Sequence, residues 1–267
     1  MILDSKPKDL LEDFLINYTK TQNVDIDLSR KIILNAMSKH SSHKDLDSYF
    51  KKIEDLWYES LEKGVPDYEL YNEDYYFTDL FSCFIVYSRK YIRSLKKNIF
   101  KDSGVIVFDV LKNYNTIIDL GCGIGYSTAA LKQMFPHAEL LATNLEDTKQ
   151  FEFCKYNSEK YDFKLYPEVK KVGKNVDMVF ASEYFEHIEN PLEHLNEIID
   201  CLNPKCFVTA NAFNTHALGH FDEYKNNGEI ICQSKISKMF NDLLKERGYI
   251  KQKTNFWNNR PSVFIKK

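Results

Sequence analysis

The second half of the chain alternates short apolar runs with segments in which apolar residues recur at helical spacing. The runs of strand length cover 116–118, 138–145, 163–166, 176–181 and 205–212. The segments with helical spacing cover 104–114, 127–135, 151–161, 191–202 and 236–247. Short apolar runs are typical of strands buried in a parallel sheet, and their alternation with helices predicts an α/β fold. Residues 249–257 and 262–267, joined by a turn, predict a terminal antiparallel hairpin.

The first hundred residues show a different pattern, which is helical throughout and rich in aromatic side chains. One helix ends near Met37 after a cap at Asp27 or Ser29, and two more are expected over 46–63 and 78–98. No linker separates this part from the rest. We therefore expect a helical lobe at 1–103 that packs on an α/β domain at 104–267 and covers its opening.

Composition narrows the class of protein. The 267 residues are 43% hydrophobic and 28% charged, which is typical of a globular protein. No apolar run approaches the ~18 residues needed to span a membrane, and charges and Pro7 interrupt the N-terminus, so a signal peptide is not expected. We expect a cytoplasmic protein whose six cysteines, none in a Cys-x-x-Cys pair, are reduced and serve packing.

The net charge of the chain indicates which kind of partner it binds. The net charge of −3 argues against broad binding to nucleic acid and favours a small-molecule partner. Basic residues nevertheless recur along the third helix and just beyond it, at Arg89, Lys90, Arg93, Lys96, Lys97 and Lys101. This stripe is either a solvated helix face or a surface that follows the phosphates of RNA.

The most informative stretch is TIIDLGCGIGYST at 116–128, which reads as a strand, a glycine loop and the start of a helix. Glycines allow positive φ and let a ligand lie against the backbone, while the helix N-terminus favours an anionic group. A dinucleotide loop would need its third glycine one residue later, where this chain has Tyr126. An NAD-dependent dehydrogenase is therefore disfavoured.

The segment DLGCGIG resembles the first motif of class I S-adenosylmethionine-dependent methyltransferases, and the similarity continues over about the last three-fifths of the chain. The resemblance implies a Rossmann-like seven-stranded sheet with a terminal antiparallel hairpin and S-adenosyl-L-methionine as the methyl donor. The residues that it assigns to cofactor binding are Asp119, Gly121, Cys122, Gly123, Gly125, Asn144, Leu145 and Ser182. Where family members usually have an acidic ribose ligand, this chain has Asn144.

A second motif, Glu183-x-x-Glu186-His187, follows the fourth predicted strand. In a helical turn these three side chains share one face, and two carboxylates with an imidazole suit a divalent ion such as Mg²⁺ or Mn²⁺. The motif, with a later histidine, resembles the metal site of small-RNA 3′-terminal 2′-O-methyltransferases and the Glu-x-x-Glu-His of ubiquinone-pathway O-methyltransferases. That resemblance implies Glu183, Glu186, His187 and His220 as ligands, with His216 a weaker candidate.

The alternative to a metal site is a metal-free role for the same motif. In it, Glu186 braces the chain and His187 is the catalytic base or a packing residue. The loops 71–77 and 212–224 are placed to shape the acceptor site, and Tyr75 or Tyr76 would cover the cofactor. The sequence predicts O-methylation of a small hydroxylated metabolite or sugar, with or without a metal. RNA 2′-O-methylation and a non-catalytic cofactor-binding scaffold are the alternatives, and the oligomeric state is not predicted.

Overall fold

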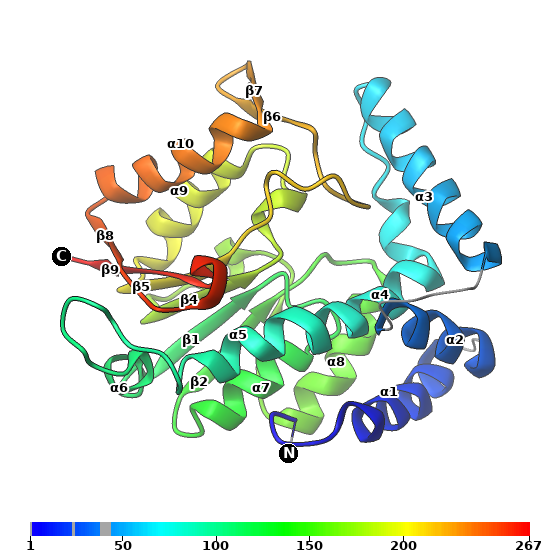
Figure 1. Ribbon diagram of the computed structural model, residues 1–267, viewed down its shortest axis with the longest axis horizontal. Coiled ribbons are helices and arrows are strands. Elements are labelled where there is room, and N and C mark those ends of the chain that lie inside the picture. The colour runs from blue at the N-terminus through cyan, green and yellow to red at the C-terminus, as the bar shows by residue number, and fades with distance from the viewer. Residues whose placement is uncertain (1, 23–24, 38–43) are drawn as a thin grey trace.

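The computed structural model describes residues 2–22, 25–37 and 44–267 and is built around one seven-stranded sheet (Figure 1). The strand order is β3-β2-β1-β4-β5-β9-β8. The strands are β1 (Thr116–Leu120), β2 (Glu139–Thr143), β3 (Lys164–Tyr166), β4 (Met178–Ser182), β5 (Cys206–Ala210), β8 (Tyr249–Gln252) and β9 (Ser262–Lys266). The first five are parallel, and β9 is antiparallel to both β5 and β8. The predicted α/β fold with its terminal antiparallel hairpin is confirmed.

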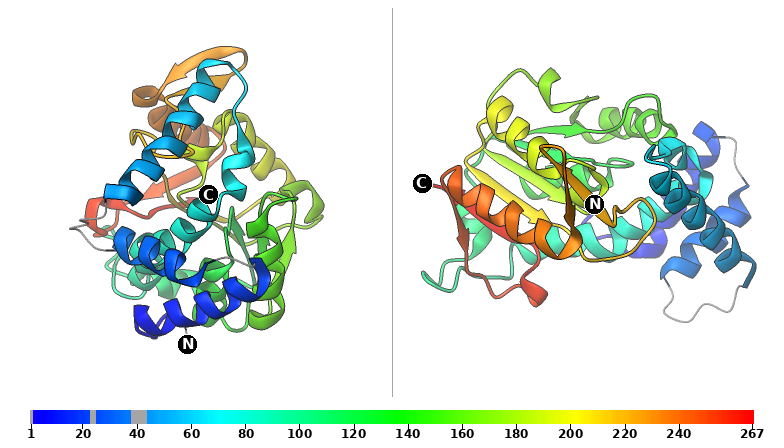
Figure 2. Two further views of the ribbon diagram at one scale, coloured as in Figure 1. Left: turned by 90° about the vertical axis from the view of Figure 1, so that its right-hand side faces the viewer. Right: turned by 90° about the horizontal axis from the view of Figure 1, so that it is seen from above.

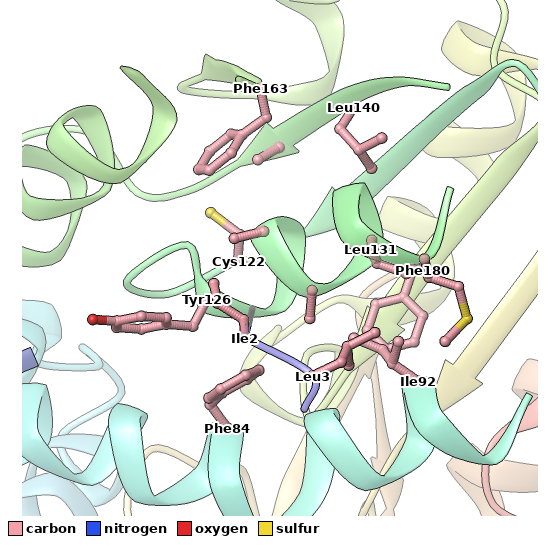
Figure 3. Close-up of a cluster of buried hydrophobic side chains, with 14 of the residues drawn as sticks. Ile2, Leu3, Phe84, Ile92, Cys122, Tyr126, Leu131, Leu140, Phe163 and Phe180 are labelled. Carbon is pink, nitrogen blue, oxygen red and sulfur yellow. The ribbon is translucent and has the colours of Figure 1, made fainter. Parts of the chain in front are cut away.

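Helices cover both faces of this sheet (Figure 1). On one face lie α6 (Val107–Leu111), α7 (Tyr126–Met134) and α8 (Lys149–Tyr161), and on the other lie α9 (Pro191–Leu202) and α10 (Gln233–Glu246). Because neighbouring residues of a strand point to opposite faces, Ile117 belongs to one hydrophobic cluster and Ile118 to the other. Figure 3 shows part of the first cluster, with Tyr126 and Phe180 within it.

The N-terminal helices begin at the end of the molecule away from β8 and β9 (Figure 2), and the last of them runs back beside α7 (Figure 1). They are α1 (Pro7–Gln22), α2 (Ile26–Met37), α3 (Lys44–Glu62), the 3-10 turn η1 (Tyr68–Asn72), α4 (Asp74–Cys83), the π-helical turn η2 (Phe84–Ser88) and α5 (Arg89–Ser94). Phe14 stacks on Phe81 with ring centroids 4.8 Å apart, and both belong to the same cluster as Tyr126. The third predicted helix begins earlier than expected and contains a π turn, a feature that often marks functional sites.

The basic stripe predicted along the third helix is interrupted. Arg89 is 4% exposed, and its guanidinium donates to the carbonyl oxygen of Leu3 at 2.9 Å and to that of Ser5. Arg89 therefore holds the N-terminal segment against α5, where Ile2 and Leu3 enter the core (Figure 3). Lys96 lies 4.9 Å from the centroid of the Phe108 ring. Arg89 therefore has a structural role, whereas Lys90, Arg93, Lys96, Lys97 and Lys101 are exposed.

Three local expectations were wrong. The helix expected to be capped by Asp27 or Ser29 begins at Ile26, and Asp25 accepts from the amides of Asp27 and Leu28 instead. The helix predicted over 104–114 is shortened to α6, and residues 212–236 contain an unexpected hairpin of β6 (Glu223–Asn226) and β7 (Glu229–Cys232). Asn227 and Gly228 both have positive φ, at 49° and 81°, as hairpin turns of type I′ require. The six cysteines are free, as expected from their spacing. Among the described residues, no helix is long and apolar enough to cross a membrane.

Candidate active site

The glycine loop joins β1 to α7 and is held by hydrogen bonds at both ends. Gly121 and Gly123 have φ of 59° and 54°, and Gly125, with φ of 85°, is the N-cap that precedes α7. Asp119, 1% exposed, accepts hydrogen bonds from the hydroxyls of Ser127 (2.6 Å) and Thr128 (2.7 Å). Burial raises the pKa of Asp119 to about 6 against these hydrogen bonds. The side chain thus ties the strand end to the first turn of α7.

The loop is also fastened to β2. The amide of Cys122 donates to the Thr143 carbonyl at 3.0 Å. The side chain of Asn144 donates from Nδ2 to the Gly123 carbonyl at 2.7 Å and accepts at Oδ1 from the amide of Leu145 at 2.9 Å. Asn144 therefore braces the glycine loop, a role that needs an amide donor and that a carboxylate could not fill.

Two cavities meet at the carboxyl ends of the strands. The first, about 600 Å³, is lined by Gly121, Gly123, Asn144 and Leu145 and reaches Glu168 beyond β3. The second, about 410 Å³, is lined by Asp119, Cys122 and Ser182 together with residues of α4 and η2. Both volumes fall in the range of about 300–1,000 Å³ typical of small-molecule sites.

The cavities share part of their lining. The shared residues are Tyr76, Leu80, Gly121, Gly123, Glu183 and His187. Gly125 lines neither cavity, because it packs behind the loop, where a Cβ atom would lie 2.9 Å from the Phe163 ring. Tyr76 is buried in the shared wall, as one of the two alternatives predicted, whereas the side chain of Tyr75 lies outside the described part of the structure.

The motif after β4 is not the helical turn that was expected. A single 3-10 turn, η4 (Phe185–His187), follows Glu183, whose φ of 52° is left-handed. Glu186 is fully buried; its Oε1 accepts from the amide of Ala212 at 2.8 Å, and its Oε2 has no partner among the described residues. Burial, and then the nearby Glu183 carboxyl, raises the pKa of Glu186 well above its ordinary value.

Glu183 is shared by the two cavities and lies beside charged and polar groups. Its Oε1 accepts from the hydroxyl of Tyr91 at 3.4 Å. Burial raises its pKa, and the positive charge of Arg260 opposes part of that rise.

Two histidines meet at this motif. His187 Nδ1 lies 3.0 Å from the Gly219 carbonyl, and His220 Nδ1 lies 2.8 Å from the Thr215 carbonyl. Because a carbonyl only accepts, both Nδ1 atoms carry the proton and both Nε2 atoms bear a lone pair. The rings meet edge to face with centroids 4.6 Å apart. Burial, then the charge that His220 can carry, lowers the pKa of His187 to about 3, so the imidazole is neutral at neutral pH.

Imidazoles held by carbonyls in this way suit a metal, but the predicted ligands do not converge on a common point. Across residues 2–22, 25–37 and 44–267, no group of three or more His, Cys, Asp or Glu side chains is placed to hold an ion. His216 lies apart, stacked on Tyr58 at 4.0 Å between ring centroids and 3.2 Å from Asp222. As placed, these residues do not fit a metal centre, so the metal site stays a prediction and no step below uses it.

Several residues of the site escaped the sequence analysis. Tyr184 lies on Gly121, where a Cβ atom would be 2.2 Å from the tyrosine ring, and its hydroxyl is 2.8 Å from His194 Nε2. From α3, Trp57 Nε1 donates to the His220 carbonyl at 2.7 Å, and the Tyr58 hydroxyl donates to the Ala217 carbonyl at 3.0 Å. Only helical spacing marked Trp57 in the sequence, and helical spacing predicts no more than burial.

This sheet order, with a glycine loop and two joined cavities at the strand ends, defines a Rossmann-like enzyme that binds a nucleotide-type cofactor. A family model for the methyltransferase domain matches residues 87–251, more than half of the chain. The chain therefore belongs to the methyltransferase domain family and contains an S-adenosylmethionine-dependent methyltransferase domain. No curated protein matches.

Solved structures are similar only at a distance. The StiE O-MT has 18% identity and a TM-score of 0.40, over 54% of this chain and 49% of that one. The methyltransferase domain of bacterial CtHen1 has 16% identity and a TM-score of 0.43, over 60% and 93%. The plantazolicin methyltransferase BpumL has 12% identity and a TM-score of 0.41, over 70% and 61%. The part of this chain that aligns with the first four similar structures covers only 44% to 61% of the length of those chains.

Proposed function

We propose that this methyltransferase acts on a hydroxyl oxygen of a small acceptor, with His187 as the general base. The observation that carries the proposal is the position and tautomer of His187. Its ring lines both cavities, and its bond to the Gly219 carbonyl leaves Nε2 as the nitrogen able to accept a proton. A base at the junction of the two cavities can meet an acceptor hydroxyl beside the methyl group of a donor that extends from the first cavity into the second.

In this proposal the donor spans the glycine loop. The adenosine half lies in the first cavity, near Asn144 and Leu145, and the methionine half passes Gly121 and Gly123 toward Ser182. Residues 104–267 form the methyl-transfer domain, and the helices of residues 1–103 cover the acceptor side, where α4 contributes Leu80 to both cavities.

When bound, S-adenosylmethionine supplies a methyl group on a sulfonium, and the carbon–sulfur bond breaks as the acceptor oxygen forms its bond to that carbon. His187 Nε2 takes the hydroxyl proton in the same step. The imidazole gains a positive charge as the sulfonium loses its own, so the total charge within the buried site is unchanged. The hydrogen bond from Nδ1–H to the Gly219 carbonyl raises the pKa of His187 against the effect of burial and stabilises the imidazolium formed in this step.

The test is a screen of small phenols, sugars and hydroxy acids for S-adenosylhomocysteine formation, followed by mass spectrometry to locate the methyl group. With any acceptor found, His187→Gln should lower kcat by about 10²–10⁴-fold, the usual contribution of a general base. The control is His216→Gln, because His216 is exposed and stacked on Tyr58 outside both cavities. Methylation of nitrogen or sulfur, or full activity of His187→Gln, would contradict the proposal.

Two further measurements test whether the reaction needs a metal and whether RNA is an acceptor. Removal of metal with EDTA should leave kcat unchanged, because the described side chains do not assemble a metal centre. An oligoribonucleotide with a free 3′ end should be a poor acceptor, because a net charge of −3 disfavours binding of a polyanion. Turnover with any acceptor would exclude the scaffold alternative.

A further inference from the structure

The wall of the second cavity is polar, and one of its polar groups has no partner. Ser82, on α4, is 3% exposed and lines this cavity, and its hydroxyl has no hydrogen-bond partner among the described residues. A buried hydroxyl normally finds a partner, because leaving one unpaired costs about 1–3 kcal/mol. Its position on the cavity wall indicates that a bound molecule supplies that partner.

One cation reaches the same cavity from the other end of the chain. Arg260 follows the 3-10 turn η5 (Trp257–Asn259) and lines the second cavity beside Tyr87. Its amide donates to the Trp257 carbonyl at 3.2 Å, which fixes the backbone that carries the side chain. Among the described residues that line this cavity, no other arginine or lysine occurs, and the acidic side chains there are Asp79, Asp119 and Glu183.

The charge of Arg260 is not neutralised by an ion pair. Among the described residues, no acidic side chain forms an ion pair with it, although Glu183 is near enough to feel its charge. The Tyr91 hydroxyl, which donates to Glu183 at 3.4 Å, also faces Arg260. Arg260 thus keeps donors available at the cavity mouth, and its planar guanidinium matches the paired oxygens of a carboxylate or phosphate.

Building on the proposed function, we propose that the methyl acceptor is a small hydroxylated oxyanion whose carboxylate or phosphate binds Arg260 while Ser82 hydrogen-bonds its interior part. The hydroxyl to be methylated then faces His187, which lines the same cavity. A volume of about 410 Å³ suits a molecule of this size rather than a polymer.

The experiment titrates the protein loaded with S-adenosylhomocysteine by calorimetry, using matched acids and neutral analogues. The pairs are 3-hydroxybenzoate and 3-hydroxybenzyl alcohol, glycerate and glycerol, and ribose 5-phosphate and ribose. At least one oxyanion should bind about ten- to a hundredfold more tightly than its neutral analogue, the ratio expected for a hydrogen bond to a charged group. Whether the preferred probe is a carboxylate or the phosphate identifies the source of the charge.

Variants of Arg260 and Ser82 test whether these residues cause the preference for the oxyanion. Arg260→Gln should abolish the preference for the oxyanion, Arg260→Lys should restore part of it, and Ser82→Ala should weaken both members of the preferred pair. The matched control is Lys253→Gln, which removes the same charge from the same terminal hairpin at an exposed residue whose amine is 3.8 Å from Asp102. This control should keep the preference.

The outcomes separate this inference from the proposed function. The inference is overturned if no oxyanion is preferred, if Arg260→Gln keeps the preference, or if Lys253→Gln loses it equally. Methylation of neutral hydroxyls without any preference for acids, or of an RNA 3′ end alone, would also overturn it, although oxygen methylation itself would stand. Binding that depends on Arg260, together with a methyl group found on nitrogen or sulfur, would support the oxyanion site and refute the proposed function.

Discussion

Gly219 offers the sharpest test of how His187 is held. The residue has φ of +81°, and a Cβ atom there would lie 2.9 Å from His187 Nδ1 and 3.3 Å from Cε1. In Gly219→Ala the left-handed backbone alone costs about 1–2 kcal/mol. The imidazole must also move, which breaks its hydrogen bond to the Gly219 carbonyl and adds about 0.5–1.5 kcal/mol. We expect a total loss of about 1.5–3.5 kcal/mol in the free energy of unfolding.

The chain provides a matched control. Gly228, in the β6–β7 turn, also has φ of +81°, but a Cβ atom there would meet nothing within 4 Å. Gly228→Ala therefore carries the backbone strain without the contact, and we expect it to lose only about 1–2 kcal/mol.

Urea unfolding of both variants measures the difference, and nitrogen NMR of the imidazoles reports which atom of His187 is protonated. Gly219→Ala should be the less stable variant and should lose the fixed Nδ1–H form, while Gly228→Ala should keep it. Equal stabilities together with an unchanged His187 tautomer would refute the argument that Gly219 fixes the position of the ring.

Three further outcomes are expected. Asn144→Asp should weaken binding of S-adenosylhomocysteine in calorimetry, because a carboxylate would face the Gly123 carbonyl to which Asn144 now donates. Tighter binding would contradict the role of Asn144 in bracing the loop. The pKa of His187 is about 3 when folded and 6.5 ordinarily, so the unfolded state binds more protons between these values, and stability falls as the pH falls from 6.5 toward 3. Urea unfolding at pH 7 and at pH 5 measures this loss. Between these two pH values the free energy of unfolding should fall less in His187→Asn than in the parent protein, by up to about 1.4 kcal/mol per pH unit below 6.5. Trp57→Phe leaves the His220 carbonyl without its donor, so thermal unfolding should show a loss of about 1–3 kcal/mol with unchanged affinity for S-adenosylhomocysteine.

The residues expected to hold the methyl donor could be predicted from the sequence because they lie close to one another in the chain. Asp119, the glycines and the start of α7 are neighbours in the chain, and the hydrogen bonds from Ser127 and Thr128 to Asp119 span only eight and nine residues. The strands β1, β2, β4 and β5 were equally readable, since each is a short, mostly apolar run that is largely buried, whereas β3 is only partly buried.

The acceptor side could not be predicted in the same way, because it is assembled from distant segments. Trp57 and Arg260 reach the site only through tertiary packing, and no pattern around either residue marks a functional role. The shape of the motif at Glu183 was misjudged because a left-handed residue interrupts the expected helical turn. The β6–β7 hairpin did carry a signal, the Asn227–Gly228 pair, which its polar flanks obscured.

The contact between α3 and the loop before β6 has a consequence for how such an enzyme can diversify. The backbone that carries His220 is fastened by Trp57, which lies 163 positions earlier in the sequence, whereas no hydrogen bond joins the described residues of α3 to the glycine loop. Changes in α3 would therefore alter the acceptor side of the cleft first. The helix α4 reaches both sides, because its Leu80 lines both cavities, so α3 is the part of the lobe that can vary with the acceptor while the donor site is kept.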